Sequence, residues 1–387
     1  MASKTDGPWS LVATIKQSGP VDLSKPYDTA SLAGKTILIT GGASGFGAGF
    51  ARRWASHGAH IIIGDINDTA AVELIAELRA LPGSSGHHHF QHCDVTLWED
   101  QVALFRAAAR LSPTGGIDAV VANAGIIEKY SALSGRGFEC PGDLDCDSPP
   151  PPDLNCVRVN LTGVMYTVHL ALFWLPRNAR NTPVESDSGT GGGQPPRDRH
   201  ILLVSSVAGI VPLAGQSEYT TSKHGVMGLF RALRGTAWRQ GIRVNMIAPY
   251  FVDTPLIPQT GMVLLAGGAK AELDDVIDAA TRLMADATIV GRGLSIGPKV
   301  RCVDDEDGVP RLVEMGKSGS GNGNGNGQTR GIWELYAHDY EEVELFVWRY
   351  ITAINVLKNI RGWIGTVRDL FGIYMSSGKG GRRSPAK

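Results

Sequence analysis

The chain has 387 residues, enough for an α/β core of about 250 residues plus additional segments. Its 37 basic and 38 acidic residues give a formal net charge of −1, which argues against nucleic acid or an anionic membrane as a ligand and favours a small neutral substrate. The five cysteines show no C-x-x-C spacing, and no run approaches about 18 uninterrupted apolar residues. We therefore expect a soluble, cytoplasmic protein with no nucleic-acid partner and no integral membrane span.

From Lys35 onward, short β-branched runs alternate with helical patterns, which is typical of a Rossmann-type, doubly wound α/β fold. The runs are continuously apolar, as expected for parallel strands covered by helices on both faces. Seven parallel strands are predicted, at residues 36–40, 60–65, 89–93, 118–122, 200–205, 242–248 and 293–298. They are predicted to form one domain, residues 32–315.

Several segments depart from this pattern in composition. Residues 1–31 form an N-terminal extension, and two insertions rich in Pro, Gly and Asp occupy residues 131–153 and 177–198. The Gly/Ser/Asn-rich residues 316–328 predict a flexible linker, and we expect this linker and both insertions to be poorly ordered.

Residues 329–387 are predicted to form a C-terminal helical tail, because apolar positions from Trp333 to Met375 fall on a broad helical face. The simplest interpretation is a helix packed on the domain or on a second subunit. A membrane-surface helix or a lid over the substrate remains an alternative.

A glycine-rich turn, Thr40–Gly47, directly follows the first predicted strand and precedes a helix. Such glycines let the backbone turn sharply and approach a pyrophosphate at the helix N-terminus. The second strand ends in Asp65, where a carboxylate can accept a hydrogen bond from an adenosine ribose hydroxyl and repel a 2′-phosphate. Neither Ala43 nor Ser44 is basic, so we expect NAD rather than NADP. Alternatively, Asp65 caps the next helix.

Polar residues also follow the third and fourth strands, at Asp94-Val95 and Asn123-Ala124-Gly125. In open α/β sheets, ligands bind at the carboxyl ends of the strands. These turns are therefore expected to border the same site as the glycine-rich turn.

Together these motifs resemble the short-chain dehydrogenase/reductase superfamily, in its compact dehydrogenase-type subgroup, and most of all the 15-hydroxyprostaglandin-dehydrogenase-like enzymes. The family pattern T-G-x-x-x-G-x-G is present at Thr40–Gly47, and Ser206 lies thirteen residues before Tyr219, the family spacing. Lys223 follows Tyr219 by four residues, so both side chains share one helical face. The resemblance covers Leu32 to about Pro298, with all motifs in family order.

The resemblance implies a catalytic tetrad of Asn160, Ser206, Tyr219 and Lys223. It also implies the cofactor contacts Gly41, Ser44, Gly45, Phe46, Gly47, Asp65, Ile66, Asp94, Val95, Asn123, Ala124, Gly125, Tyr219, Lys223, Val252 and Thr254. Val252 and Thr254 would hold the nicotinamide carboxamide. Tyr250 stands where the family usually has glycine and is expected to reshape the pocket floor.

These residues predict an NAD-dependent oxidoreductase that interconverts a secondary alcohol and a ketone. Tyr219 would be the acid/base, and the Lys223 cation would lower its pKa from about 10. Ser206 would orient the substrate oxygen, and Asn160 would support a water chain from Lys223. The expected substrate is a lipophilic lipid, steroid or polyketide-like secondary metabolite, and the resemblance implies a homodimer or homotetramer.

Two other functions are alternatives for a chain with these motifs. A non-catalytic dinucleotide-binding sensor or scaffold would use the tail from Trp333 to contact partners. A sugar epimerase or dehydratase is disfavoured by the glycine spacing. The run His87-His88-His89 with His92 is not expected to bind zinc, because alternate side chains on a strand point to opposite faces.

Overall fold

The computed structural model describes residues 15–130, 136–142, 145, 147–181, 197–255, 270–304, 310–312, 328–335, 353 and 356. Gln17–Tyr336 forms one compact unit, and Met1–Lys16 with Ala337–Lys387 forms a second, of which few residues are described. Apart from Gln328, the predicted linker lies outside the described residues. So does nearly all of the predicted tail beyond Leu335.

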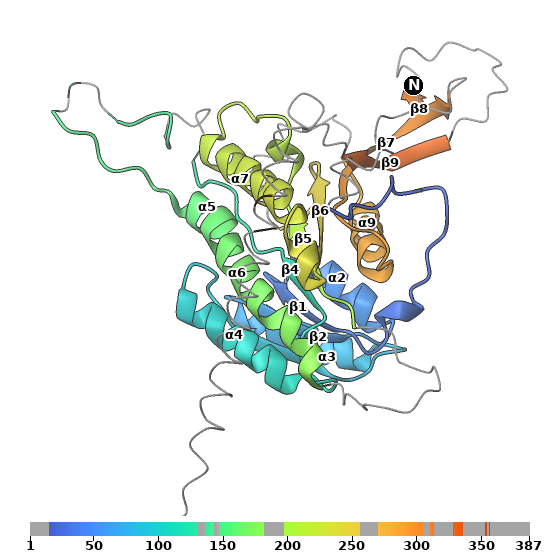
Figure 1. Ribbon diagram of the computed structural model, residues 1–387. Helices are drawn as coiled ribbons and strands as arrows, with labels where there is room; N and C mark the ends of the chain where they lie inside the picture. The colour runs from blue at the N-terminus through green and yellow to red at the C-terminus, as the bar shows by residue number, and fades with distance from the viewer. Residues whose placement is uncertain are drawn as a thin grey trace, which may run out of the picture. The chain divides into compact units, whose positions relative to one another are not determined.

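One twisted sheet forms the centre of the larger unit (Figure 1). Its parallel strands are β1 (Thr36–Thr40), β2 (His60–Asp65), β3 (His88–His92), β4 (Ala119–Ala122), β5 (His200–Val204), β6 (Arg243–Pro249) and β7 (Gly293–Asp304). They lie in the order β3-β2-β1-β4-β5-β6-β7. The chain winds outward from β1 to β3 and then crosses to β4, so the order reverses beside β1. All seven predicted strands are confirmed, and the fold is the expected Rossmann type.

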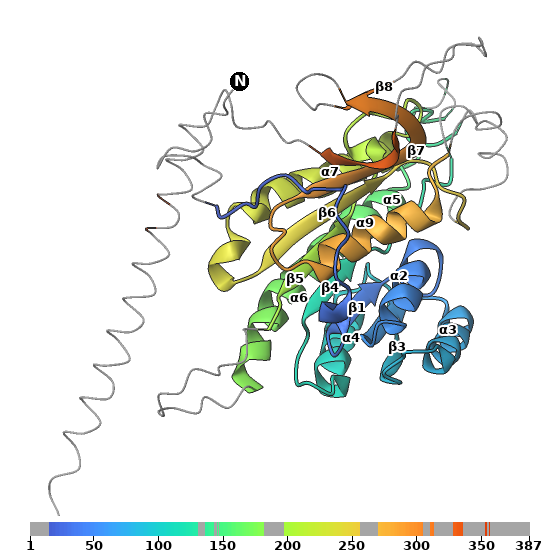
Figure 2. The same ribbon diagram turned by 90° about the vertical axis from the view of Figure 1, so that its right-hand side faces the viewer.

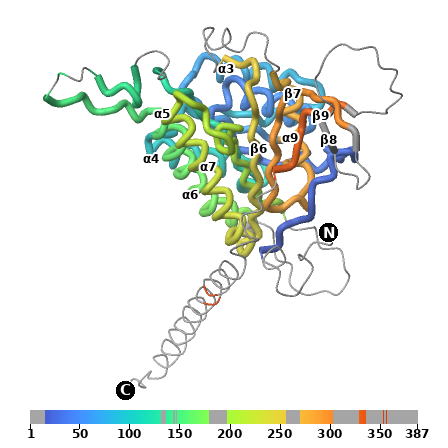
Figure 3. The backbone as a smooth tube through the Cα atoms, turned by 90° about the horizontal axis from the view of Figure 1, so that it is seen from above, coloured from blue at the N-terminus to red at the C-terminus, as the bar shows by residue number. Residues whose placement is uncertain are grey.

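Helices cover both faces of the sheet, because successive strand side chains alternate between the two faces. Ile37 and Ile39 of β1 pack into the core beneath α2 (Gly45–Ala55), α3 (Asp68–Ala80) and α9 (Leu273–Ala285). Leu38 faces the opposite core, formed with α4 (Trp98–Leu111), α6 (Val164–Trp174) and α7 (Ser217–Arg234). Figures 1 and 3 show these last three helices together on one side of the sheet.

The far edge of the sheet differs from the prediction. β7 continues to Asp304 and pairs antiparallel with β8 (Pro310–Leu312) and with β9 (Gln328–Leu335) (Figure 2). The assignment of Gln328 to a flexible linker and of residues 329–335 to a helical tail was therefore wrong. The outer edge of β7 supplies a hydrogen-bond ladder that local sequence patterns do not reveal. Ile332 of β9 also packs against the core.

The predicted N-terminal extension is partly integral to this unit. The Tyr27 hydroxyl donates to Asp278 Oδ1 at 2.6 Å, and Arg282 of α9 lies over the Tyr27 ring, 4.6 Å from its centroid. The backbone N–H of Val21 donates to Glu334 of β9 at 3.3 Å. The compact unit is consequently wider at both ends than the predicted residues 32–315.

Among the described residues, one helical stretch, Asn155–Asn178, is long and apolar enough to cross a membrane by length and composition alone. It contains α5 (Asn155–Val157), a π-helical segment (Arg158–Gly163) and α6. Val164, Val168 and Ala171 are buried against the sheet, as expected for a core helix of a globular domain.

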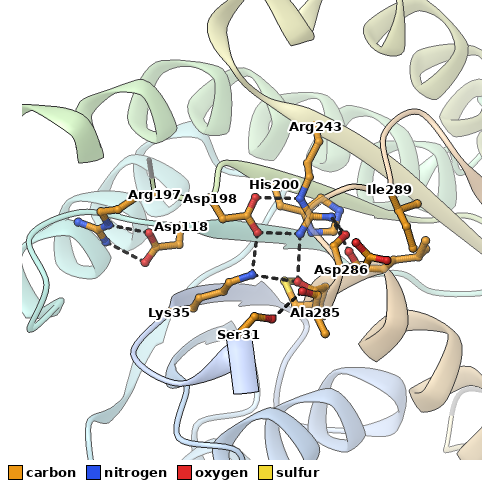
Figure 4. A network of polar contacts seen from close by, with 12 residues as sticks. Ser31, Lys35, Asp118, Arg197, Asp198, His200, Arg243, Ala285, Asp286 and Ile289 are labelled. Atoms are coloured by element: carbon orange, nitrogen blue, oxygen red, sulfur yellow. Dashed lines mark hydrogen bonds and ion pairs between the residues drawn. The ribbon is translucent and has the colours of Figure 1, made fainter. Parts of the chain in front are cut away.

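Both ends of the second predicted insertion are firmly held, contrary to the expectation of poor order, while residues 182–196 lie outside the described residues. Asn178 is buried and donates to the carbonyl of Asp198 at 3.0 Å. The Asp198 carboxylate forms ion pairs with Lys35 Nζ at 2.8 Å and Arg243 Nη2 at 2.7 Å (Figure 4). This network lies at the amino ends of β1, β5 and β6.

Candidate active site

The carboxyl ends of β1 and β4 are braced by two polar side chains. The Asn123 amide donates to the carbonyls of Thr40 and Gly41 at 3.0 and 2.8 Å. The Thr40 hydroxyl donates to Val121 O at 3.3 Å and accepts from the backbone N–H of Asn123 at 3.2 Å. The family's N-N-A-G element reads Ala122-Asn123-Ala124-Gly125 here, with Ala in place of its first Asn, and the contacts of Asn123 still hold the two strand ends together.

The glycine-rich turn needs its glycines for close packing and for its backbone angles. Gly41 has φ +63°, and a Cβ there would lie 2.7 Å from Ala124 Cα. A Cβ at Gly47 would lie 2.3 Å from Gly41 O, so this glycine allows α2 to pack on the turn. No side chain caps the N-terminus of α2 among the described residues. The first N–H groups of α2 therefore remain available to an anion such as a pyrophosphate.

Asp65 ends β2 beside this turn and also shapes it. Its Oδ2 accepts from Ala43 N–H at 2.9 Å, and its Oδ1 accepts from Asn67 N–H at 3.0 Å. Asn67, rather than Asp65, is the N-cap of α3. Asp65 thus stabilises two turns and keeps its carboxylate at the mouth of the pocket.

A pocket of about 320 Å³ runs along this edge of the sheet. Twelve predicted cofactor residues line it: Gly41, Ser44, Gly45, Phe46, Asp65, Ile66, Asp94, Val95, Asn123, Ala124, Gly125 and Thr254. The other four predicted cofactor contacts do not line it: Gly47, Val252, Tyr219 and Lys223. Gly47 packs against the turn, and Val252 is buried and bridges to Ala271. The pocket's glycine-rich lining and the uncapped N-terminus of α2 are suited to the pyrophosphate of a dinucleotide.

Four lining residues escaped the sequence prediction: Cys93, Ile126, Val159 and Pro255. Each is a direct neighbour of a predicted residue, so extending the motifs by one position would have found them.

Ser206 follows β5, and Tyr219 and Lys223 lie on one face of α7, as the four-residue spacing requires. Ser206 Oγ accepts from Ala208 N–H at 3.1 Å, which fixes its side chain at the start of a 3₁₀ turn. Lys223 Nζ donates to Val204 O at 3.2 Å and lies 5.6 Å from the Tyr219 ring centroid. Ser206 lies close enough to the Tyr219 hydroxyl to lower its pKa. Three predicted catalytic residues are therefore adjacent.

Asn160 lies in the π-helical segment and completes the group. Its Oδ1 accepts from Ile126 N–H, and its Nδ2 donates to Ile126 O, both at 2.8 Å. Nδ2 also contacts Ser222 Oγ of α7 at 3.2 Å. A Cβ built at Gly125 would lie 3.3 Å from Asn160 Oδ1 and 3.6 Å from Lys223 Nζ, so these two polar groups meet at Gly125.

The pKa of Tyr219 differs from the prediction that Lys223 would lower it. Burial raises the pKa of Tyr219 above its usual 10, although the hydrogen bond from Ser206 opposes the shift. Burial also lowers the pKa of Lys223 to about 8. The expected depression of the Tyr219 pKa by the Lys223 cation is therefore not found. Desolvation is the largest cause of both shifts.

Tyr250, at the unusual position, packs edge-on against Phe251 with ring centroids 4.9 Å apart. Its backbone N–H donates to Ile296 O at 2.7 Å, which ties it to β7. The nearest atom to a Cβ built at Gly45 is Thr254 Cβ, at 4.0 Å, so Thr254 faces the glycine-rich turn. The bulky ring of Tyr250 therefore does not displace Thr254 from the pocket.

The histidines do not converge on a common point. His60 meets His87 edge-on at 5.1 Å between centroids, while His92 pairs with Asp68 at 2.7 Å. Burial lowers the pKa of His88 to about 4, and its ring contacts Ser84. Within the described part of the chain, no group of three or more His, Cys, Asp or Glu residues is arranged to hold a metal ion.

Comparison with known proteins adds to this geometry. The family model for short chain dehydrogenases matches residues 35–261. The chain is 36% identical over 285 residues to 5′-hydroxyaverantin dehydrogenase of Dothistroma septosporum, covering 72% of this chain and 89% of that protein. It is 35% identical over 293 residues to 5′-hydroxyaverantin dehydrogenase of Emericella nidulans, with the same coverage.

Among solved structures, 3-ketoacyl-(acyl-carrier-protein) reductase from Brucella melitensis, complexed with NADH, matches with a TM-score of 0.54 and 25% identity. The match covers 68% of this chain and 97% of that one.

Proposed function

The chain belongs to the short chain dehydrogenase family and is an oxidoreductase acting on CH–OH groups, and from this premise we propose that it interconverts a secondary alcohol and a ketone with NAD, using Tyr219 as acid/base. The observation that carries the proposal is the convergence of Ser206, Tyr219, Lys223 and Asn160 next to Gly125, which lines the pocket at the glycine-rich turn. Four polar residues from separate segments of the chain would not meet at one edge of the sheet by chance.

In the oxidative direction, the Tyr219 oxygen takes the carbinol proton, and Ser206 holds the substrate oxygen. The raised pKa of Tyr219 requires extra stabilisation of the phenolate during this step. Lys223 supplies it when protonated, and Asn160, which is hydrogen-bonded to Ile126 in the loop after β4, lies near Lys223 beside Gly125. In the reductive direction, neutral Tyr219 donates its proton to the forming alkoxide. When bound, the nicotinamide dinucleotide supplies hydride acceptance or donation.

The choice between NAD and NADP depends on Asp65. Its negative charge at the pocket mouth disfavours a 2′-phosphate, and it accepts two backbone hydrogen bonds at its present position. We expect Asp65→Asn to lower the ratio of kcat/KM for NAD to that for NADP by about 10- to 100-fold, the usual worth of a charge-assisted hydrogen bond. The ratio is measured by initial rates with each cofactor.

The control for this prediction is Asp68→Asn, which removes a nearby exposed carboxylate that pairs with His92. It is expected to leave the cofactor ratio unchanged. An unchanged ratio in Asp65→Asn as well would remove Asp65 from cofactor selection.

For the substrate, we propose a lipophilic secondary alcohol of the lipid, steroid or polyketide-like class. The two relatives named for 5′-hydroxyaverantin favour a hydroxylated secondary metabolite among these. The test is NADH absorbance with purified protein, NAD and a panel that contains 5′-hydroxyaverantin, hydroxysteroids and hydroxy fatty acids. Dinucleotide binding by calorimetry without turnover of any alcohol or ketone would instead support a sensor or scaffold.

We also propose that the protein is a homodimer or homotetramer. Trp98 of α4 contacts Tyr166 of α6 edge-on, with centroids 5.4 Å apart, and Met165 and Phe173 are half-exposed on the same helix. This apolar surface is suited to a second copy of the chain. Light scattering after size-exclusion chromatography is expected to give at least twice the mass of 41.2 kDa, and Phe173→Glu is expected to shift it toward the monomer.

A further inference from the structure

The loop after β4 contacts both helices that carry the proposed catalytic residues. Ile126 holds Asn160 of the π-helical segment through two hydrogen bonds of 2.8 Å. Two residues later, Glu128 Oε2 accepts from the backbone N–H of Glu218 at 3.3 Å. The loop therefore connects Asn160 with the first turn of α7.

The contact of Glu128 occurs where α7 lacks other acceptors. The first N–H groups of a helix have no intrahelical partner, and the N-cap residue Gln216 supplies no side-chain hydrogen bond. A carboxylate at this end also interacts favourably with the helix dipole. Glu218 immediately precedes Tyr219, so Glu128 restrains the backbone next to the proposed acid/base.

A second carboxylate reinforces the same turn. The Ser217 hydroxyl donates to Glu139, which belongs to the first predicted insertion. This insertion and the loop after β4 enclose a cavity of about 120 Å³ beside Glu128, with Phe138 and Cys156 in its wall. Glu128 itself lines this cavity.

Glu128 occupies a position that is unfavourable for its own charge. Its Oε1 is fully buried and has no hydrogen-bond partner among the described residues. Burial raises the pKa of Glu128 to about 7, and the carboxylates of Glu218 and Glu139 act in the same direction. The other charged or titratable groups around the loop are Lys129, Asp153, Cys156 and Lys223. A costly ionisable group in a functional region commonly serves the reaction rather than stability.

We propose that Glu128 is a positioning residue whose carboxylate fixes the first turn of α7 and thereby aligns Tyr219 with the substrate. The inference rests on the proposed role of Tyr219. Since an ionised carboxylate is the stronger acceptor, alignment improves as Glu128 loses its proton.

The effects of pH on stability and on activity then run in opposite directions. The pKa of Glu128 in the folded protein, about 7, lies above the ordinary value of 4.5 for a glutamate side chain. Between these two pH values the folded protein therefore binds more protons than the unfolded chain. Protonation of Glu128 contributes stability that is fully present below pH 4.5 and is lost as the pH rises through 7. Over the upper part of that range, kcat is expected to rise.

The test compares Glu128→Gln and Glu128→Leu in the full chain, with the best alcohol from the substrate panel. Leu removes the acceptor, so kcat is expected to fall about 10-fold, the worth of one hydrogen bond, with the KM for NAD unchanged. Gln keeps a neutral acceptor oxygen but cannot ionise, so its kcat is expected to match that of the wild type at low pH, to exceed that of Glu128→Leu, and to show no inflection near pH 7. It is also expected to raise Tm at pH 8. The inflection from Lys223, near pH 8, should remain in both variants.

The control is Glu77→Gln, a surface change in α3 that leaves kcat and the pH profile as in the wild type. An unchanged kcat in Glu128→Leu would overturn the inference. Equal losses of kcat, NAD affinity and Tm would also overturn it, because they indicate a general structural role. If Glu128→Leu does not fold, Glu128→Gln alone tests the inference. An inflection near pH 7 that persists in Glu128→Gln would then overturn it. Full activity of Tyr219→Phe would instead refute the proposed function itself.

Discussion

Tyr219→Phe is expected to lower kcat by about 10²- to 10⁴-fold, the usual contribution of a general acid or base. The substitution removes one hydroxyl and keeps the ring. Neither the α7 backbone nor the contact of Lys223 Nζ with Val204 O depends on that hydroxyl. Phe offers no group that can exchange a proton at this position. Initial rates of NADH formation measure the loss.

Two controls separate this chemical effect from a loss of fold or cofactor. Calorimetry should show NAD binding within about twofold of the wild type, because no Tyr219 atom lines the dinucleotide pocket. Tyr166→Phe makes the same chemical change on α6, where the ring contacts Trp98, and should leave kcat unaltered. Wild-type turnover in Tyr219→Phe would show that another group moves the proton.

The features that could be predicted from the sequence are those defined by short stretches of chain. The strand β1, the turn Thr40–Gly47 and the pair Tyr219/Lys223 each depend on periodicity or spacing within a few residues. A parallel sheet then brings its carboxyl ends to one edge, so local motifs at Asp65, Asp94 and Asn123 converge without further information.

The missed features depend on contacts between distant segments. Strand β9 exists because the edge of β7, about thirty residues earlier, offers a ladder to Gln328–Leu335. Glu128 is ninety residues from its partner Glu218, and no pattern near Glu128 indicates that contact. The pKa of Tyr219 was predicted in the wrong direction because its spacing to Lys223 gives proximity but not the burial of both groups.

Asp198→Asn is expected to destabilise the protein by about 3–5 kcal/mol, the usual cost of breaking a buried ion pair. The substitution would leave Lys35 and Arg243 without their counter-charge in a region where all three side chains are at most 10% exposed. Although burial alone would raise the pKa of Asp198, Arg243 and Lys35 hold it well below the usual range. At about 2–4 °C per kcal/mol, Tm should fall by roughly 10 °C in thermal unfolding.

Position in the fold makes this prediction distinct from the catalytic ones. The Asp198 network joins the amino ends of β1, β5 and β6, whereas the pocket lies at the carboxyl ends, so kcat of the folded variant should equal that of the wild type (Figure 4). The control, Glu77→Gln, breaks the half-exposed Arg52–Glu77 pair and should cost less than about 1 kcal/mol. Adding Lys35→Met to Asp198→Asn should recover part of the lost Tm, because it removes one uncompensated buried cation. A Tm of Asp198→Asn within about 2 °C of the wild type would show that the ends of the second insertion are held by packing rather than by charge.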